Sequence, residues 1–491
     1  MDNKVNIRRL STGVPGLDNL LGGGLPEFSF NLIAGTPGSG KTTLAHQIMF
    51  TQAKPDNRAL FFTVLGEPPL KMLRYQQQFS YFDISKVNES IRFVNLSQDL
   101  LEGDFDIVSA RIAQEVRDYA PSLVFVDSFR SVVLSARAKS SGTAGLQRFV
   151  QELGMQMTGW QATTFLIGEY LSPEAESSPI FTVADGILWL TQNLHRNSVV
   201  RKMQVVKMRG QNQSTGLHTF RMNLDGIRVF PRAIQQEDNA ASQGKKISRA
   251  QGRISIGIPG LDQMLGGGLP MGYALLVVGP SGSGKTILTT QFLEEGMRRG
   301  ETGVVAAFEK SPSQLLNKKL AAMIKDKQVA VVNTRALDLS IDETLGDLIE
   351  MVRKTNAKRL VIDSLSGFEL ALAPEFSEDF RGSLYRMIAQ LTDMGITIVM
   401  IAELEDRYTD LRFSPYGSAF LADAIVVQRY IEMAGKLERV CAVVKVRGSD
   451  HSKDIRLFSI NDEGIEIGKA VTGYSGLLTG QPQPVASGKG K

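Results

Sequence analysis

The strongest constraint on this chain is a segment that occurs twice. Residues 11–43 read STGVPGLDNLLGGGLPEFSFNLIAGTPGSGKTT, and residues 255–287 read SIGIPGLDQMLGGGLPMGYALLVVGPSGSGKTI. Of these 33 paired positions, 19 are identical. The two copies lie much farther apart than the units of a solenoid repeat, so the sequence predicts a duplicated domain.

Later landmarks recur in the same order in each copy. An apolar run ends in Asp-Ser, a Lys-x-Arg-Gly turn follows, and a strand pair closes the copy around an acidic residue, a glycine and an isoleucine. These landmarks lie at 123–128, 207–210 and 225–227 in the first copy, and at 360–364, 445–448 and 463–465 in the second. The duplication therefore extends over most of the chain.

The repeat divides the chain into four predicted segments. They are a first domain over residues 1–232, a linker over 233–252, a second domain over 253–470 and a flexible C-terminal tail over 471–491. The linker is predicted because residues 235–251 are rich in Gln, Asn, Ser, Lys and Ala and poor in apolar side chains.

Within each domain, short β-branched runs alternate with amphipathic stretches. In the second domain the runs lie at 274–279, 303–308, 329–333, 359–363, 397–402 and 424–428. Continuous apolar strands that alternate with helices are typical of a parallel sheet covered on both faces. The predicted fold class is therefore α/β, with two tandem domains that each contain a mostly parallel twisted sheet.

A phosphate-binding loop begins each domain. Residues 35–42 and 279–286 both match G-x-x-x-x-G-K-[ST], and each match follows a β-type run and opens a helical pattern. Glycines let the backbone turn its N–H groups toward phosphates, and the helix dipole favours the anion. Lys41 and Lys285 are predicted to contact the β- and γ-phosphates of ATP. The predicted nucleotide-binding residues are Gly35, Thr36, Pro37, Gly38, Ser39, Gly40, Lys41, Thr42, Thr43, Gly279, Pro280, Ser281, Gly282, Ser283, Gly284, Lys285, Thr286 and Ile287.

The same motifs predict a Mg²⁺ ion in each domain. Thr42 and Thr286 place a hydroxyl where such loops hold the metal, and an acid at the end of a neighbouring strand completes the site. Asp127 and Asp363 end suitable apolar runs. The alternative for either aspartate is a helix N-cap or a turn residue.

Hydrolysis also requires a group that orients or deprotonates water. In domain two, Glu309 directly follows a predicted strand and is the candidate base; the alternative is an ordinary exposed carboxylate beside Lys310. In domain one, the equivalent strand offers only Glu67, which is displaced by one or two positions. Glu67 is either the water-activating residue of this domain or a loop carboxylate before Pro68.

The combination of the duplicated GxPGLDxxLGGGLP…GxxGSGKT pattern, the Asp-Ser strand ends and the Lys-x-Arg-Gly turns resembles the KaiC family of RecA-like ATPases. The resemblance covers about residues 7–475. It implies a double-ring hexamer with ATP bound between neighbouring subunits. It also implies that Lys207 and Arg209, and likewise Lys445 and Arg447, approach the phosphates of the adjacent subunit. The alternative is that these residues form basic surface turns.

The sequence departs from the circadian clock protein of that family at two places. That protein has paired glutamates after the second strand of each domain, whereas domain two here has Glu309 followed by Lys310. It is also phosphorylated on an adjacent Ser-Thr pair, and Ala419 and Phe420 stand at those positions here. Neither residue has a hydroxyl, so the sequence excludes autophosphorylation there.

The leading functional hypothesis is an ATP-binding and hydrolysing hexameric switch that signals to a protein partner. An autokinase is one alternative, and a RecA-like motor acting on DNA is another. Domain one could also bind ATP with little turnover and serve as a structural ring. The net charge of +4 over 491 residues is a small excess that does not by itself argue for a nucleic acid partner, so none is expected.

Composition restricts the remaining possibilities. Cys441 is the only cysteine, so a disulfide framework and a multi-cysteine metal site are excluded. The first residues show no apolar signal segment, and no apolar run approaches the ~20 residues of a membrane helix. A cytoplasmic protein without membrane contact is therefore expected.

Overall fold

The computed structural model describes most of the chain. The described residues are 7–64, 69–102, 105–132, 142–171, 178–195, 198–232, 252–308, 318–333, 340–372, 380–404, 421–433, 435–479 and 482–484. The chain divides into two compact units, Met1–Ile234 and Gln235–Lys491. The division falls within the segment predicted as a linker, and each unit contains one copy of the repeat.

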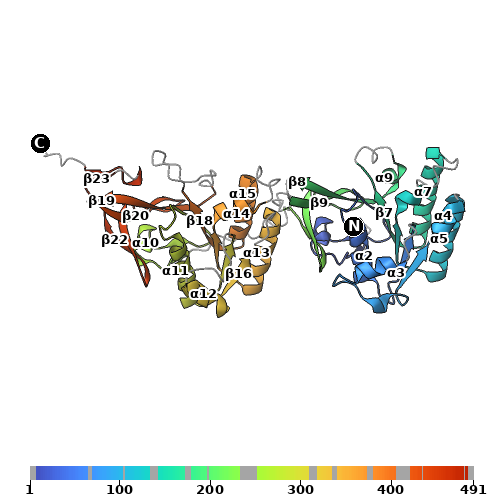
Figure 1. Ribbon diagram of the computed structural model, residues 1–491, viewed down its shortest axis with the longest axis horizontal. Helices are drawn as coiled ribbons and strands as arrows, with labels where there is room; N and C mark the ends of the chain where they lie inside the picture. Colours follow the sequence, from blue (N-terminus) through green and yellow to red (C-terminus); the bar gives the residue numbers. More distant parts are fainter. Residues whose placement is uncertain are drawn as a thin grey trace, which may run out of the picture. The chain divides into compact units, whose positions relative to one another are not determined.

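One large sheet organises the first unit (Figure 1). In the described part, its order is β11-β10-β9-β8-β3-β7-β6-β4-β5. The strands from β5 to β8 run parallel, and β9, β10 and β11 continue the sheet antiparallel. The strands are β3 (Phe30–Gly35), β4 (Ala59–Thr63), β5 (Ile91–Asn95), β6 (Leu123–Asp127), β7 (Thr163–Glu169), β8 (Gly186–His195), β9 (Ser198–Met208), β10 (His218–Asn223) and β11 (Gly226–Phe230).

Helices cover both faces of this sheet because its strands are apolar on both sides. On β3, Leu32 and Ala34 pack with α5 and α7, whereas Ile33 points the other way and packs with α1 and α2. The described helices of the unit are α1 (Leu17–Leu20), α2 (Lys41–Gln52), α3 (Pro69–Gln76), α4 (Ser97–Glu102), α5 (Phe105–Tyr119), α7 (Gly142–Gly159) and α9 (Pro179–Val183).

The second unit repeats this arrangement (Figure 1). Its sheet has the order β16-β15-β17-β18-β14-β19-β20-β21-β22 among the described residues. The strands from β16 to β19 are parallel and the last three are antiparallel. The strands are β14 (Ala274–Gly279), β15 (Gly303–Ala307), β16 (Val329–Asn333), β17 (Arg359–Asp363), β18 (Thr397–Glu403), β19 (Ala424–Met433), β20 (Lys436–Val446), β21 (Arg456–Asn461) and β22 (Gly464–Ala470).

Both faces of the second sheet are also buried. Val277 packs with α10, α11 and α12, while Leu276 and Val278 alternate with it and are fully buried toward the other side. The described helices are α10 (Pro259–Met264), α11 (Lys285–Arg298), α12 (Lys318–Lys325), α13 (Ile341–Thr355), α14 (Leu365–Ala371) and α15 (Phe380–Asp393). The predicted tandem RecA-like α/β fold is confirmed.

Short strand pairs and turns complete the described chain. The glycine-rich start of each repeat forms a small antiparallel pair, and a further pair lies near the C-terminus. These strands are β1 (Arg9–Leu10), β2 (Leu25–Pro26), β12 (Arg253–Ile254), β13 (Leu269–Pro270), β23 (Tyr474–Ser475) and β24 (Gln483–Pro484).

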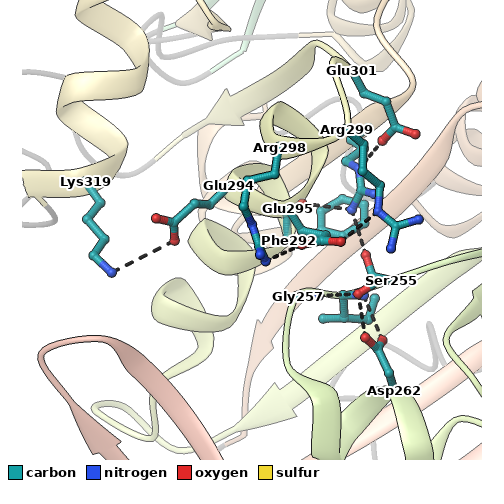
Figure 2. Close-up of polar contacts among 12 residues, drawn as sticks. Ser255, Gly257, Asp262, Phe292, Glu294, Glu295, Arg298, Arg299, Glu301 and Lys319 are labelled. Atoms are coloured by element: carbon teal, nitrogen blue, oxygen red, sulfur yellow. Dashed lines mark hydrogen bonds and ion pairs between the residues drawn. The ribbon is translucent and has the colours of Figure 1, made fainter.

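A buried arginine distinguishes the core of the second unit from that of the first. Arg359 begins β17 and its side chain is 0% exposed. Its Nε donates to the Glu301 carboxylate over 2.6 Å, and another of its nitrogens donates to the carbonyls of Ser255 and Phe292 over 2.8 Å each. Figure 2 shows these partners around the C-terminal part of α11, where Glu295 also pairs with two arginines. At the equivalent strand position, the first unit has a leucine, Leu123.

This buried pair leads to a prediction about stability. Replacing Glu301 by glutamine should destabilise the second unit by roughly 2–4 kcal/mol, because it leaves the Arg359 charge buried without its counter-ion. Replacing Arg359 by leucine, the residue of the first unit, should cost far less, because Glu301 is 23% exposed and remains partly hydrated. Urea denaturation of the nucleotide-free variants measures both effects.

The double variant is the decisive control. Arg359→Leu combined with Glu301→Gln removes both charges, so it should recover most of the stability that Glu301→Gln loses. A double variant that is less stable than Glu301→Gln alone would contradict this account.

Candidate nucleotide-binding sites

The first phosphate loop connects the central strand β3 to α2. Gly40 is the N-cap residue of α2 and has a φ angle of 100°, a backbone conformation that favours glycine. Because the N-cap residue is a glycine, no side chain caps the helix from this position. The N–H groups of the first turn therefore remain available to an anion.

Lys41 begins this helix and is largely buried. Its Nζ donates to the Thr36 carbonyl over 2.8 Å and lies 4.0 Å from a carboxylate oxygen of Glu169. Burial lowers the pKa of the Lys41 amine, and the carboxylates of Glu169 and Asp127 partly offset that effect. A phosphate group would supply the anionic partner that a buried ammonium requires.

The loop also contains polar atoms whose hydrogen-bonding capacity is unused. The hydroxyl oxygens of Thr36 and Ser39 are buried, with no hydrogen-bond partner in the described part of the chain. Buried hydroxyls in native proteins are nearly always paired, so these two atoms indicate a ligand. Together with the uncapped helix and Lys41, they fit the phosphates of a nucleotide.

The metal side of the first site combines a hydroxyl and a carboxylate. Thr42 Oγ1 donates to Asp127 Oδ2 over 2.7 Å, and Asp127 ends β6. Burial raises the pKa of the Asp127 carboxyl to about 6. A hydroxyl and a carboxylate are ligands that suit Mg²⁺, which takes its other oxygens from phosphates and water.

The second site has the same arrangement with local differences. Lys285 Nζ donates to the carbonyls of Gly279 and Pro280 over 2.8 and 2.7 Å. Thr286 Oγ1 lies 3.4 Å from Asp363 Oδ2, a looser contact than that in the first unit. In this loop, the Ser283 hydroxyl contacts Gln428 over 3.2 Å.

A cavity adjoins each phosphate loop. In the first unit it has a volume of about 510 Å³ and its lining includes Lys41, Thr42, Thr43, Asp127 and Glu169. In the second unit, a cavity of about 550 Å³ opens at Thr286, Ile287 and Asp363 and continues along α11 to Leu293. Both volumes fall within the range of small-molecule sites.

The side chains that line the two cavities differ at equivalent positions of the repeat. Thr290 and Val305 line the second cavity, at the repeat positions where the first unit has His46 and Phe61. The His46 and Phe61 rings stack with centroids 4.7 Å apart, and Phe61 lines the first cavity.

The Lys-x-Arg-Gly residues lie away from the phosphate loop of their own unit. Lys207 Nζ donates to the Thr182 carbonyl over 2.9 Å, and Arg209 pairs with Asp185 over 3.2 Å. Lys445 donates to the Ala422 carbonyl over 2.8 Å, and Arg447 pairs with the neighbouring Asp423 over 3.5 Å. Burial and the adjacent arginine lower the pKa of both lysines.

Two pairs of acidic residues that no sequence motif singled out lie beside these groups. Asp185 and Asp423 each directly precede a strand. Each accepts a hydrogen bond from the first backbone N–H of the central strand of its unit, over 3.0 and 3.1 Å. They also form the ion pairs with Arg209 and Arg447. Glu169 and Glu403 each end the strand beside the phosphate loop. The available signal was a repeated apolar run that ends in glutamate, at 163–169 and 397–403.

The candidate catalytic glutamates Glu67 and Glu309 lie outside the described residues, as do Ala419 and Phe420. Their assignments therefore stay predictions. Every residue of the two phosphate loops lies within the described ranges. Among the described helices, none is long and apolar enough to cross a membrane.

Two mostly parallel sheets, each with a phosphate loop between its central strand and the following helix, define a protein of the tandem RecA-like P-loop class. The family profile described as "ATPase: KaiC" matches residues 10–234 and again 254–472. The chain therefore belongs to the KaiC ATPase family.

Curated relatives extend over nearly the whole chain. The circadian clock protein KaiC3 of Synechocystis sp. (strain PCC 6803) is 30% identical over 98% of this chain and 95% of its own length. The circadian clock oscillator protein KaiC of Picosynechococcus sp. (strain PCC 7002) is 28% identical over 98% and 93%. That of Thermosynechococcus vestitus is 26% identical over 99% and 93%.

Proposed function

We propose that the chain binds ATP and Mg²⁺ in each repeat, hydrolyses ATP in a homo-oligomer, and acts as a switch whose nucleotide state a protein partner reads. Membership of the KaiC ATPase family supports nucleotide binding. The names of the relatives describe clock proteins. Because Ala419 and Phe420 have no hydroxyl, the proposal includes no phosphorylation at those positions.

The proposed oligomer is supported by the distance between the phosphate loop and the Lys-x-Arg-Gly cations of the same unit. Gly35 on β3 pairs with Leu190 on β8, and Leu190 in turn pairs with Met203 on β9. Lys207 lies four residues farther along β9, which is roughly 13 Å at ~3.3 Å per residue, and Arg209 lies beyond the strand end. This separation supports the proposal that these cations act at a phosphate site other than their own.

Each group has a defined task in the proposed mechanism. Lys41 and Lys285 would hold phosphate oxygens of ATP, while the Thr42–Asp127 and Thr286–Asp363 pairs would hold Mg²⁺. The metal neutralises phosphate charge when bound. Arg209 of the partner subunit, and Arg447 in the second ring, would stabilise the negative charge that develops on the transferring phosphoryl group.

Molar mass in solution tests this proposal directly. Light scattering on the chain of 53.7 kDa should give a hexamer with ATP and Mg²⁺ and a lower mass when nucleotide is removed, because ligand binding at a subunit interface stabilises the assembly. A mass that does not depend on nucleotide, together with no detectable ATP binding, would refute the proposal.

A further inference from the structure

Another cavity of the first unit lies at the opposite edge of the sheet from the phosphate loop. Its volume is about 760 Å³, within the range of small-molecule sites. It opens where β6 and β7 begin, at Leu123 and Thr163, and at Gln52, the last residue of α2. Helix α2 begins at Lys41, and its 12 residues separate the cavity from the phosphate site by roughly 17 Å at ~1.5 Å per residue. We call this space the amino-edge cavity.

Three residues that line the amino-edge cavity have a left-handed backbone although none of them is a glycine. The φ angles are 61° at Phe28, 47° at Ala120 and 56° at Gln161. Most side chains avoid this conformation because it brings Cβ close to a carbonyl oxygen. The backbone is therefore strained at three points around one cavity, and strain of this kind is often found at functional sites.

The second unit has the same backbone at these three positions but uses residues that favour it. The residues that correspond to Phe28, Ala120 and Gln161, counted from the strands that follow them, are Gly272, Asn356 and Gly395, with φ angles of 74°, 50° and 79°. The fold thus requires the left-handed backbone in both repeats but does not require the side chains of the first unit. Those side chains indicate a role at the cavity that glycine does not supply.

Two aromatic side chains give the amino-edge cavity a surface for a planar ring. Phe28 is 36% exposed, and Trp160 packs partly buried against the core of the first unit. At the equivalent positions, the second unit has Gly272 and Met394. Accessible aromatic faces bind planar aromatic rings by stacking. The aromatic surface is therefore specific to the first unit.

The charges around the amino-edge cavity favour an anion. The charged residues that line it are Arg8, Glu27, Lys54, Asp56 and Arg117. Arg8 and Glu27 form an ion pair over 3.6 Å. The other two cations, Lys54 and Arg117, are exposed and face a single further acid, Asp56. The excess of positive charge attracts a negatively charged group.

We propose that the amino-edge cavity binds a small planar heterocycle that carries an anionic group. The ring stacks on the two aromatic side chains, and the two exposed cations bind the anion. The carboxamides of Asn57 and Gln161, which also line the cavity, donate to and accept from polar atoms at the edge of the ring. This site is separate from the proposed ATP sites and does not depend on them.

Two flavins that differ by one phosphate group test the ligand class. Riboflavin and flavin mononucleotide share a planar heterocycle, but only the mononucleotide is an anion. The full-length chain should bind the mononucleotide with about tenfold higher affinity, because hydrogen bonds to a charged group are the stronger ones. Quenching of flavin fluorescence measures both affinities. No saturable binding of the mononucleotide, or equal affinity for the two flavins, would overturn the proposal.

Variants that copy the second unit separate a role in binding from a role in folding. Phe28→Gly combined with Gln161→Gly should weaken binding of flavin mononucleotide about tenfold, because a stacking surface is lost. The urea denaturation midpoint should not fall, because glycine adopts the left-handed backbone without strain. Lys327→Gly, at a left-handed position of the second unit, is the matched control and should leave the affinity unchanged. Unchanged affinity in the double glycine variant would contradict the proposal.

A charge variant decides the case even if the glycine variant folds poorly. Lys54→Gln combined with Arg117→Gln changes only exposed side chains and leaves the strained turns intact. It should reduce the affinity for flavin mononucleotide to that for riboflavin, whereas Lys436→Gln, an exposed position of the second unit, should have no effect. Parental affinity for the mononucleotide in this charge variant would place the anion elsewhere and refute the assigned site.

Discussion

Replacing both Lys41 and Lys285 by alanine should lower ATP turnover by a factor of about 100–1,000 and weaken ATP binding. Lys41 is the buried cation of the first phosphate loop, and Lys285 is the half-buried cation of the second. Among the described residues, Lys41 is the only lysine or arginine that lines the cavity of the first unit. Loss of one preorganised donor aimed at developing charge has an effect of that size on kcat. Steady-state release of inorganic phosphate measures the change.

The single variants separate the two sites. Lys41→Ala should remove the share of turnover contributed by the first unit, and Lys285→Ala that of the second. If domain one only binds ATP, Lys41→Ala will leave turnover intact and weaken assembly; equal losses from the two variants would refute that division. Lys54→Ala and Lys436→Ala, at exposed positions, are the charge-matched controls. Full turnover in the double variant would contradict the assigned phosphate sites.

Replacing both Arg209 and Arg447 by alanine should lower kcat by a factor of about 1,000, because an arginine that stabilises the transferring phosphoryl group has an effect of that order. ATP binding to the phosphate loops should persist, because both arginines lie near the starts of the parallel strands, whereas their own loop follows the end of the central strand. Turnover measured under saturating ATP, beside equilibrium binding of ATP, distinguishes the two effects.

A mixing experiment then shows which subunit supplies the cation. Neither the double lysine variant nor the double arginine variant should hydrolyse ATP alone. Mixed before nucleotide is added, they should recover about one quarter of the parental turnover, since random assembly in a closed ring pairs an intact loop with an intact arginine at that frequency. If the arginines acted within their own chain, the mixture would stay inactive.

Several features of the site could be read from short contiguous stretches. The phosphate loops, with Lys41 and Thr42 in one unit and Lys285 and Thr286 in the other, follow from the local backbone that glycines permit. Asp127 and Asp363 could be predicted because each directly ends an apolar run. The structure brings them within hydrogen-bond distance of Thr42 and Thr286, respectively. Glu67 and Glu309 stay predictions, because they lie outside the described residues.

The sequence alone determined the duplication, the α/β class and the two phosphate loops, because each depends on periodicity or on a motif within one turn of chain. Only the tertiary structure decided that Glu169 and Glu403 lie between the loop and the metal-side aspartate, and that Lys207 and Arg209 lie far from their own loop. The physical reason is the strand order: neighbours in these sheets are distant in the chain, so hydrogen-bond register brings together residues that no local pattern relates.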